Sequence, residues 1–173
     1  MKNRVYIFIS CLIIFYSCKN NSNNNIAYID YTSNYSTEET INVPFHDEYG
    51  VKFVTAKING AATIDMIIDT GCSETLISLL EAQQLIKRGL LSEDDFIGTS
   101  KSIIADGSIV ENMIFNLKTI ELSDGKREIL CRDILVQIST NIDAPVLLGN
   151  GVLDRVASYE VDNIEKVIKF KLK

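Results

Sequence analysis

One carboxylate in this sequence stands where a charge is unusual. A largely apolar run at residues 64–68 leads directly into Asp69, and the chain becomes apolar again at Leu76 and Ile77. A carboxylate between two buried segments must be hydrogen-bonded, paired or partly protonated, because burying it alone is costly. Such a group can give and take a proton during hydrolysis. Asp69 is therefore the candidate catalytic residue.

The alternative for Asp69 is a structural role, because an Asp at a turn commonly accepts hydrogen bonds from nearby backbone groups. A second segment favours a catalytic role through a family resemblance. At residues 147–153, two leucines and a glycine precede a short helical pattern, and strand patterns at residues 159–161 and 167–172 close the chain.

Together the two segments resemble the retropepsin-like aspartic proteases. Asp69-Thr70-Gly71, with Ser73 two residues beyond the glycine, is similar to the active-site signature of that family, and Leu147-Leu148-Gly149 is similar to its second hallmark. The viral branch has a basic residue and an Asn or Asp after this glycine, whereas this chain has Asn150-Gly151, which is nearer to the bacterial envelope branch. The resemblance covers about residues 51–172. It implies a mainly β fold, the closed β-barrel of the acid proteases, with one or two short helices.

The sequence also predicts the elements that would position the carboxylate. Alternating apolar residues on both sides of Asn59-Gly60 predict a hairpin over residues 51–68, since both positions of such a turn need positive φ. Its second strand leads into the candidate site. Ser78, followed three residues later by Glu81, is a capping-box pattern that predicts a short helix ending at Gly89.

A second hairpin is predicted over residues 101–117, with its turn at Asp106-Gly107. From the residues alone this is a surface hairpin. The family resemblance implies instead that Ala105, Asp106 and Gly107 form the tip of a flap, which closes over a peptide or protein substrate bound as an extended strand. Further strands are expected at residues 119–122 and 128–138.

The chemistry implied by the resemblance requires two carboxylates. A water must be activated by a base while an acid protonates the peptide carbonyl, and two carboxylates about 3 Å apart can do both because they share one proton. The sequence contains one Asp-Thr-Gly and no second copy, so an active endopeptidase must be a homodimer with an Asp69 from each chain. The resemblance implies that Thr70 joins the two active-site loops and that Gly71 lets the backbone approach the carboxylate pair.

Two other functional classes stay open. One is a retropepsin-like module that has lost proteolysis and serves in binding or assembly, and the other is an unrelated β-rich envelope lipoprotein. A metal or Ser-His mechanism is not expected, because His46 is the only histidine and lies in a turn-like segment at residues 44–50, where it should be on the surface. No metal and no cofactor are predicted.

The first residues are typical of an export signal. Lys2 and Arg4 precede an apolar run at residues 5–16, and Ser17 stands before Cys18. The run is too short to span a bilayer, which takes about 20 residues. The pattern resembles a bacterial lipoprotein signal with Cys18 as the lipidated residue; the alternatives are an ordinary cleaved signal or an uncleaved anchor. All three place the domain outside the cytoplasm, and the lipoprotein signal places it in the bacterial cell envelope, anchored to a membrane and facing the periplasm or the cell surface.

These patterns divide the chain into three parts: a signal peptide at residues 1–17, a lipidated cysteine with a polar tether at residues 18–40, and a protease domain at residues 41–173. Within the tether, residues 26–40 could be either linker or an added strand.

Charge and cysteine content limit the partners and the cross-links. Loss of residues 1–17 lowers the net charge from −6 to −8, so the mature chain should not bind nucleic acid, which needs a basic surface. Cys72 and Cys131 remain in the domain, as two thiols or as a disulfide that an oxidising envelope would permit. Cys72 stands where the family most often has Ala or Ser.

Overall fold

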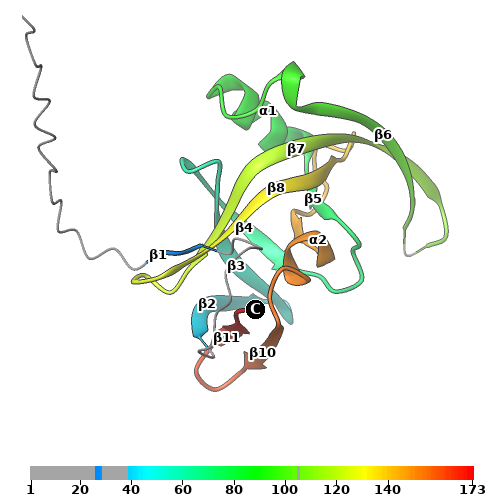
Figure 1. Ribbon diagram of the computed structural model, residues 1–173. Helices are drawn as coiled ribbons and strands as arrows, with labels where there is room; N and C mark the ends of the chain where they lie inside the picture. Colours follow the sequence, from blue (N-terminus) through cyan, green and yellow to red (C-terminus); the bar gives the residue numbers. More distant parts are fainter. Residues whose placement is uncertain (1–25, 29–38, 105) are drawn as a thin grey trace, which may run out of the picture.

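The computed structural model describes residues 26–28, 39–104 and 106–173. They form a mainly β structure with two α-helices and one 3₁₀ helix (Figure 1), which confirms the expected fold class. The strands are β1 (Ile26–Tyr28), β2 (Thr40–Glu48), β3 (Val51–Ile58), β4 (Ala62–Ile68), β5 (Thr75–Ile77), β6 (Phe96–Ile103), β7 (Ile109–Ser123), β8 (Glu128–Ile138), β9 (Leu147–Leu148), β10 (Ser158–Asp162) and β11 (Val167–Lys171). The helices are α1 (Leu79–Lys87), η1 (Glu93–Asp95, 3₁₀) and α2 (Asn150–Leu153). In the described ranges, no helix is long and apolar enough to cross a membrane.

Six strands close into a ring in the order β3, β4, β9, β5, β8 and β7, because β7 pairs back with β3. From β3 the sheet continues through β2 and β11 to β10, and from β7 it continues to β6. In Figure 1 the long, curved β7 and β8 run across the molecule from the upper right, where β6 lies, to the left beside β1, and β2, β10 and β11 lie below them. The largest fully buried side chains are Ile41, Ile58, Met66, Ile77, Leu85, Leu91, Leu117, Ile120, Leu122, Ile129, Ile134 and Phe170.

The hairpin that leads to Asp69 forms as predicted. β3 and β4 pair antiparallel from Phe53 opposite Ile67 to Ile58 opposite Ala62. Three residues connect the strands: Asn59 and Gly60 have φ values of 48° and 70°, and the N–H of Ala61 donates to the carbonyl of Ile58 at 3.1 Å.

Helix α1 also begins and ends where predicted. The Ser78 hydroxyl accepts hydrogen bonds from the N–H groups of Leu80 and Glu81, and Gly89 follows the helix with a φ of 69°. Ala82 and Leu85 are the buried residues of the helix.

The predicted hairpin at residues 101–117 is longer than expected. β6 begins at Phe96, and β7 runs unbroken to Ser123, so the separate strand expected at residues 119–122 is the end of β7. The β6–β7 hairpin extends beyond the body of the molecule and curves toward its tip (Figure 1).

The segment at residues 44–50 differs from the prediction. β2 continues to Glu48, and the turn consists of Tyr49 and Gly50, both with positive φ. His46 is exposed, as expected, but it lies in the strand, and its ring stacks on Phe53 at 5.2 Å between centroids.

At the N-terminal side, Ile26–Tyr28 pairs parallel with Glu128–Leu130 of β8. This places a short strand within the segment for which linker and added strand were both open. Residues 1–25, including Cys18 and the expected signal peptide, lie outside the described residues.

Candidate active site

Asp69 directly follows β4 and is held at both its backbone and its side chain. Its N–H donates to the carbonyl of Leu148 at 3.1 Å, which extends the parallel pairing of β4 with β9 by one residue. Its Oδ1 accepts a hydrogen bond of 2.8 Å from the N–H of Gly71. The side chain is half-buried. Asp69 therefore has a fixed position and a defined orientation, which a proton-transferring carboxylate needs.

The two segments singled out in the sequence meet because β9 lies between β4 and β5. Ile68 is opposite Leu148 in the parallel pair, and Leu76 is opposite Leu147 in the antiparallel pair. The loop at residues 69–74 therefore wraps around the end of a strand more than seventy positions later in the sequence.

Gly149 makes this arrangement possible. A Cβ at this position would lie 2.0 Å from the carbonyl oxygen of Glu74 and 2.7 Å from that of Cys72, far inside van der Waals contact. The φ of Gly149 is −94°, so close packing rather than backbone conformation requires glycine here.

The start of α2 contacts the same loop through hydrogen bonds. The N–H of Asn150 donates to the carbonyl of Cys72 at 2.9 Å, and the N–H of Gly151 donates to that of Ser73 at 3.0 Å. The first N–H groups of a helix have no partner within the helix, so the loop carbonyls satisfy them.

One contact of the site was not predicted from the sequence. The side-chain Nδ2 of Asn150 donates to the carbonyl oxygen of Thr70 at 3.0 Å. The only sequence signal for it is that Asn150 stands where the viral branch has a basic residue.

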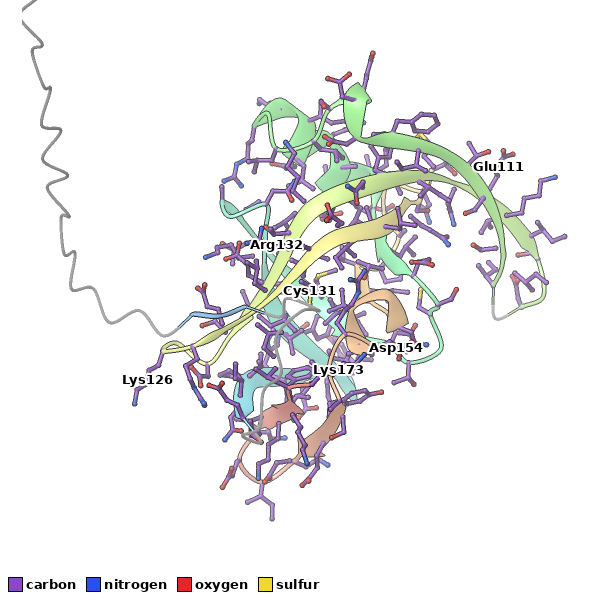
Figure 2. All side chains as sticks on the ribbon, in the orientation of Figure 1. Glu111, Lys126, Cys131, Arg132, Asp154 and Lys173 are labelled. Atoms are coloured by element: carbon purple, nitrogen blue, oxygen red, sulfur yellow. The ribbon has the colours of Figure 1, made fainter. Side chains whose placement is uncertain are left out.

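Cys72 and Cys131 are both free thiols, and no disulfide joins them. The Cys72 Sγ donates to the carbonyl of Glu74 at 2.8 Å, and burial together with the negative charge of Asp69 raises the pKa of this thiol. Burial raises the pKa of Cys131 to about 11. Figure 2 shows Cys131 within the body of the molecule. Both thiols stay protonated near neutral pH, so neither is an activated nucleophile.

The turn at Asp106-Gly107 forms the tip of the β6–β7 hairpin, whereas Ala105 lies outside the described residues. The Oδ1 of Asp106 accepts from the N–H of Ser108 at 2.8 Å, and hydrogen bonds from Ser108 hold the pKa of Asp106 below its usual value. Gly107 has a φ of 84°, which lies in the left-handed region that favours glycine. Ile103 and Ile109 flank the tip and are 76% and 67% exposed.

The single chain brings some of the predicted residues together and not others. Asp69, Thr70 and Gly71 lie beside β9 and α2. In the described part of the chain, no hydrogen bond joins the hairpin tip to the Asp69 loop.

A cavity of about 350 Å³ lies on the α2 side of the loop, lined by Ser73, Glu74, Leu135, Asn150, Gly151, Asp154 and Arg155. Figure 2 marks Asp154 beside α2.

Within the residues that the structure describes, no group of three or more His, Cys, Asp or Glu side chains could hold a metal ion.

Comparison with solved structures agrees with this architecture. No family model matches the chain, and no curated protein matches it. Among solved structures, the chain is similar to a retropepsin-like aspartic protease from Rickettsia conorii, with a TM-score of 0.52 and 16% identity over 79% of this chain and 92% of that one. At this identity the likeness shows the fold. The expected retropepsin-like fold is therefore confirmed.

Proposed function

We propose that this protein is an aspartic endopeptidase that works as a homodimer. The observation that carries the proposal is the position of Asp69: a half-buried carboxylate at the end of β4, with its Oδ1 fixed by the N–H of Gly71, in a fold similar to that of a retropepsin-like protease. A carboxylate held in this way is the group that the chemistry of such an enzyme needs.

One chain supplies half of the catalytic machinery. Peptide hydrolysis by carboxylates needs one group that takes a proton from water and one that gives a proton to the peptide carbonyl. Two Asp69 side chains facing each other across a two-fold axis share a single proton and fill both roles. The water attacks the peptide carbon, the resulting diol collapses, and the amine leaves after it gains a proton.

The other residues of the site have supporting roles in this proposal. Thr70 is exposed on the Asp69 loop, where its hydroxyl can reach the same loop of a second copy. Gly71 keeps the approach to the carboxylates open. Asp106 and Gly107 form the tip of the flap, whose exposed Ile103 and Ile109 can contact the side chains of an extended peptide.

We also propose that the domain is anchored in the bacterial cell envelope through lipid on Cys18. The support is the sequence at residues 1–18. The substrate would then be a peptide or protein of the periplasm or the cell surface.

The decisive experiment is cleavage of a mixed peptide library at mildly acidic pH by the wild-type chain and by Asp69→Asn. A matched control is Asp65→Asn, because Asp65 is an exposed carboxylate four residues earlier that accepts a hydrogen bond from Thr55. We expect cleavage by the wild type and by Asp65→Asn, none by Asp69→Asn, and a steep loss of specific activity on dilution as the dimers separate.

If neither the wild type nor Asp69→Asn cleaves peptides over a wide pH range at high protein concentration, the proposed protease activity is rejected. The binding or assembly module would then be the better explanation of the same fold. A rate that is maximal well above neutral pH would also contradict a shared-proton mechanism.

A further inference from the structure

The loop that follows β4 is tied to α2 by three hydrogen bonds, and one of them depends on a side chain. The backbone N–H groups of Asn150 and Gly151 donate to the carbonyls of Cys72 and Ser73, and these bonds can form with any residue at position 150 except proline. The third bond runs from Nδ2 of Asn150 to the carbonyl of Thr70 at 3.0 Å. Substitution of Asn150 would remove this bond alone.

The carbonyl that Asn150 holds belongs to the same peptide unit as the N–H that holds Asp69. A trans peptide is planar, and its C=O and N–H point in opposite directions. At one edge of the peptide plane, the Thr70 carbonyl oxygen accepts a hydrogen bond from Asn150 at 3.0 Å. At the opposite edge, the Gly71 N–H donates to Oδ1 of Asp69 at 2.8 Å. If the plane rotates, both bonds are lost together.

We infer that Asn150 is a positioning residue for Asp69, acting through the Thr70–Gly71 peptide unit. The inference rests on the proposed function, in which Asp69 is the catalytic carboxylate. In the part of the chain that the structure describes, no hydrogen bond joins Asn150 directly to Asp69. Asn150 fixes the plane of the peptide, and its hydrogen bond to the carbonyl polarises that peptide so that the Gly71 N–H becomes a stronger donor.

The residue type fits this role. An amide nitrogen is a donor, which a carbonyl needs, whereas an ionised Asp at the same position would present only acceptors and would repel the Thr70 oxygen. The bond joins residues eighty positions apart in the sequence. The hydrogen bond from the Asn150 N–H to the Cys72 carbonyl already places the Asn150 side chain beside the loop.

The sequence allows a direct measurement on this peptide unit. Thr70-Gly71 is the only Thr-Gly pair among the nine glycines of the chain. If the full-length protein is labelled with ¹³C at threonine carbonyls and ¹⁵N at glycines, an NMR experiment that correlates each amide with the preceding carbonyl gives one cross-peak. Its carbonyl shift reports the bond from Asn150, and its proton shift reports the bond to Asp69.

The variants are Asn150→Ala, Asn150→Asp as a second variant of unchanged size, and Asn42→Ala as a control at an exposed position on β2. We expect both Asn150 variants to move the carbonyl and the proton shift of this cross-peak and to speed exchange of the Gly71 amide with solvent. Asp69→Asn should move the proton shift, and Asn42→Ala should move neither. A cross-peak that stays in place in the Asn150 variants would overturn the inference.

Kinetics give an independent test, carried out where sedimentation shows the wild type and the variants to be fully dimeric. A misplaced carboxylate should lower kcat about tenfold and leave KM within about twofold, because the inferred role of Asn150 is to orient Asp69 and not to bind substrate. An unchanged kcat, or a loss confined to KM, would reject the positioning role. If the wild type shows no cleavage that depends on Asp69, the proposed function fails, and the cross-peak still decides whether Asn150 orients Asp69.

Discussion

Gly149 and Glu74 are in direct contact, so close that a methyl group on Gly149 would lie 2.0 Å from the Glu74 carbonyl oxygen. The contact joins the turn after β9 to the loop that carries Asp69. Both partners in the contact are backbone, so no side-chain rotation can relieve an added atom. The position of the loop is therefore set by this packing as well as by hydrogen bonds.

Gly149→Ala should strongly destabilise the protein. The loop and the turn must separate by more than an ångström, which breaks the bonds from Asn150 and Gly151, and we expect a loss of about 3 kcal/mol or more in the free energy of unfolding. Gly151→Ala is the matched control, because its Cβ would meet the flexible end of the Glu74 side chain at 3.1 Å. Urea unfolding of both variants tests this. Equal midpoints for the two would show that the contact does not constrain the loop.

Thr75→Val should stabilise the protein. The side chain of Thr75 is fully buried, and its hydroxyl oxygen has no hydrogen-bond partner among the described residues. Valine has nearly the same shape and removes the unpaired polar group, for an expected gain of about 1 kcal/mol. Thr75→Ala, which also removes a methyl group, should lose stability. A destabilised Thr75→Val in thermal or urea unfolding would mean that the hydroxyl has a partner.

The Lys57–Glu121 ion pair should make stability fall at high pH. The two groups are 2.5 Å apart, and the hydrogen bond that Lys57 donates to Glu121 raises the pKa of Lys57 above the ordinary 10.5. A raised lysine pKa adds stability that is complete below the unfolded pKa and is lost as the pH rises through the folded one. Because the Lys57 side chain is 39% exposed and solvent screens the pair, Glu121→Gln should cost about 1 kcal/mol at neutral pH and progressively less as the pH rises above 10.5.

This prediction is measured as the difference in urea midpoint between wild type and Glu121→Gln, from neutral pH to above pH 10.5. The titration of other groups cancels in this difference. Glu111→Gln, at the exposed position marked in Figure 2, is the control and should show no difference at any pH. A gap between wild type and Glu121→Gln that does not narrow toward high pH would contradict the assignment to Lys57.

Cys18→Ser should release the protein from the membrane. Acyl chains gain about 0.8 kcal/mol for each buried CH₂, and stable anchoring takes more than one chain. Metabolic labelling with a fatty acid, followed by fractionation, should show label and membrane association in the wild type and in Cys11→Ser, but not in Cys18→Ser. Label that remains on Cys18→Ser would place the modification elsewhere.

The elements that the sequence predicted best are those fixed by neighbouring residues. The Asn59-Gly60 turn and the Ser78 cap depend on φ preferences and on hydrogen bonds that span two or three positions, so their residue types are sufficient evidence. The turn-like segment expected at residues 44–50 was wrong, because β2 continues through Pro44 to Glu48. In the structure the neighbouring Phe45 donates to Lys166, and the strand continues.

The surroundings of Asp69 required more than local rules. Residue types pointed to the carboxylate and, through a family resemblance, to the segment of Leu147 to Gly149. The register of Ile68 with Leu148 and the direction of the Asn150 amide result from packing between segments about eighty residues apart. No pattern within a single window of sequence specifies such contacts.

The two-residue strand β9 has a consequence for the order in which the protein matures. A ribosome makes Asp69 long before Leu148, Asn150 and Gly151, and the hydrogen bonds that hold the loop need all three. A chain that is emerging from the ribosome, or crossing a membrane from its N-terminus, therefore contains Asp69 before the hydrogen bonds that position its loop can form. The proposed hydrolytic activity therefore requires that residues 148–151 have been made and have packed against the Asp69 loop.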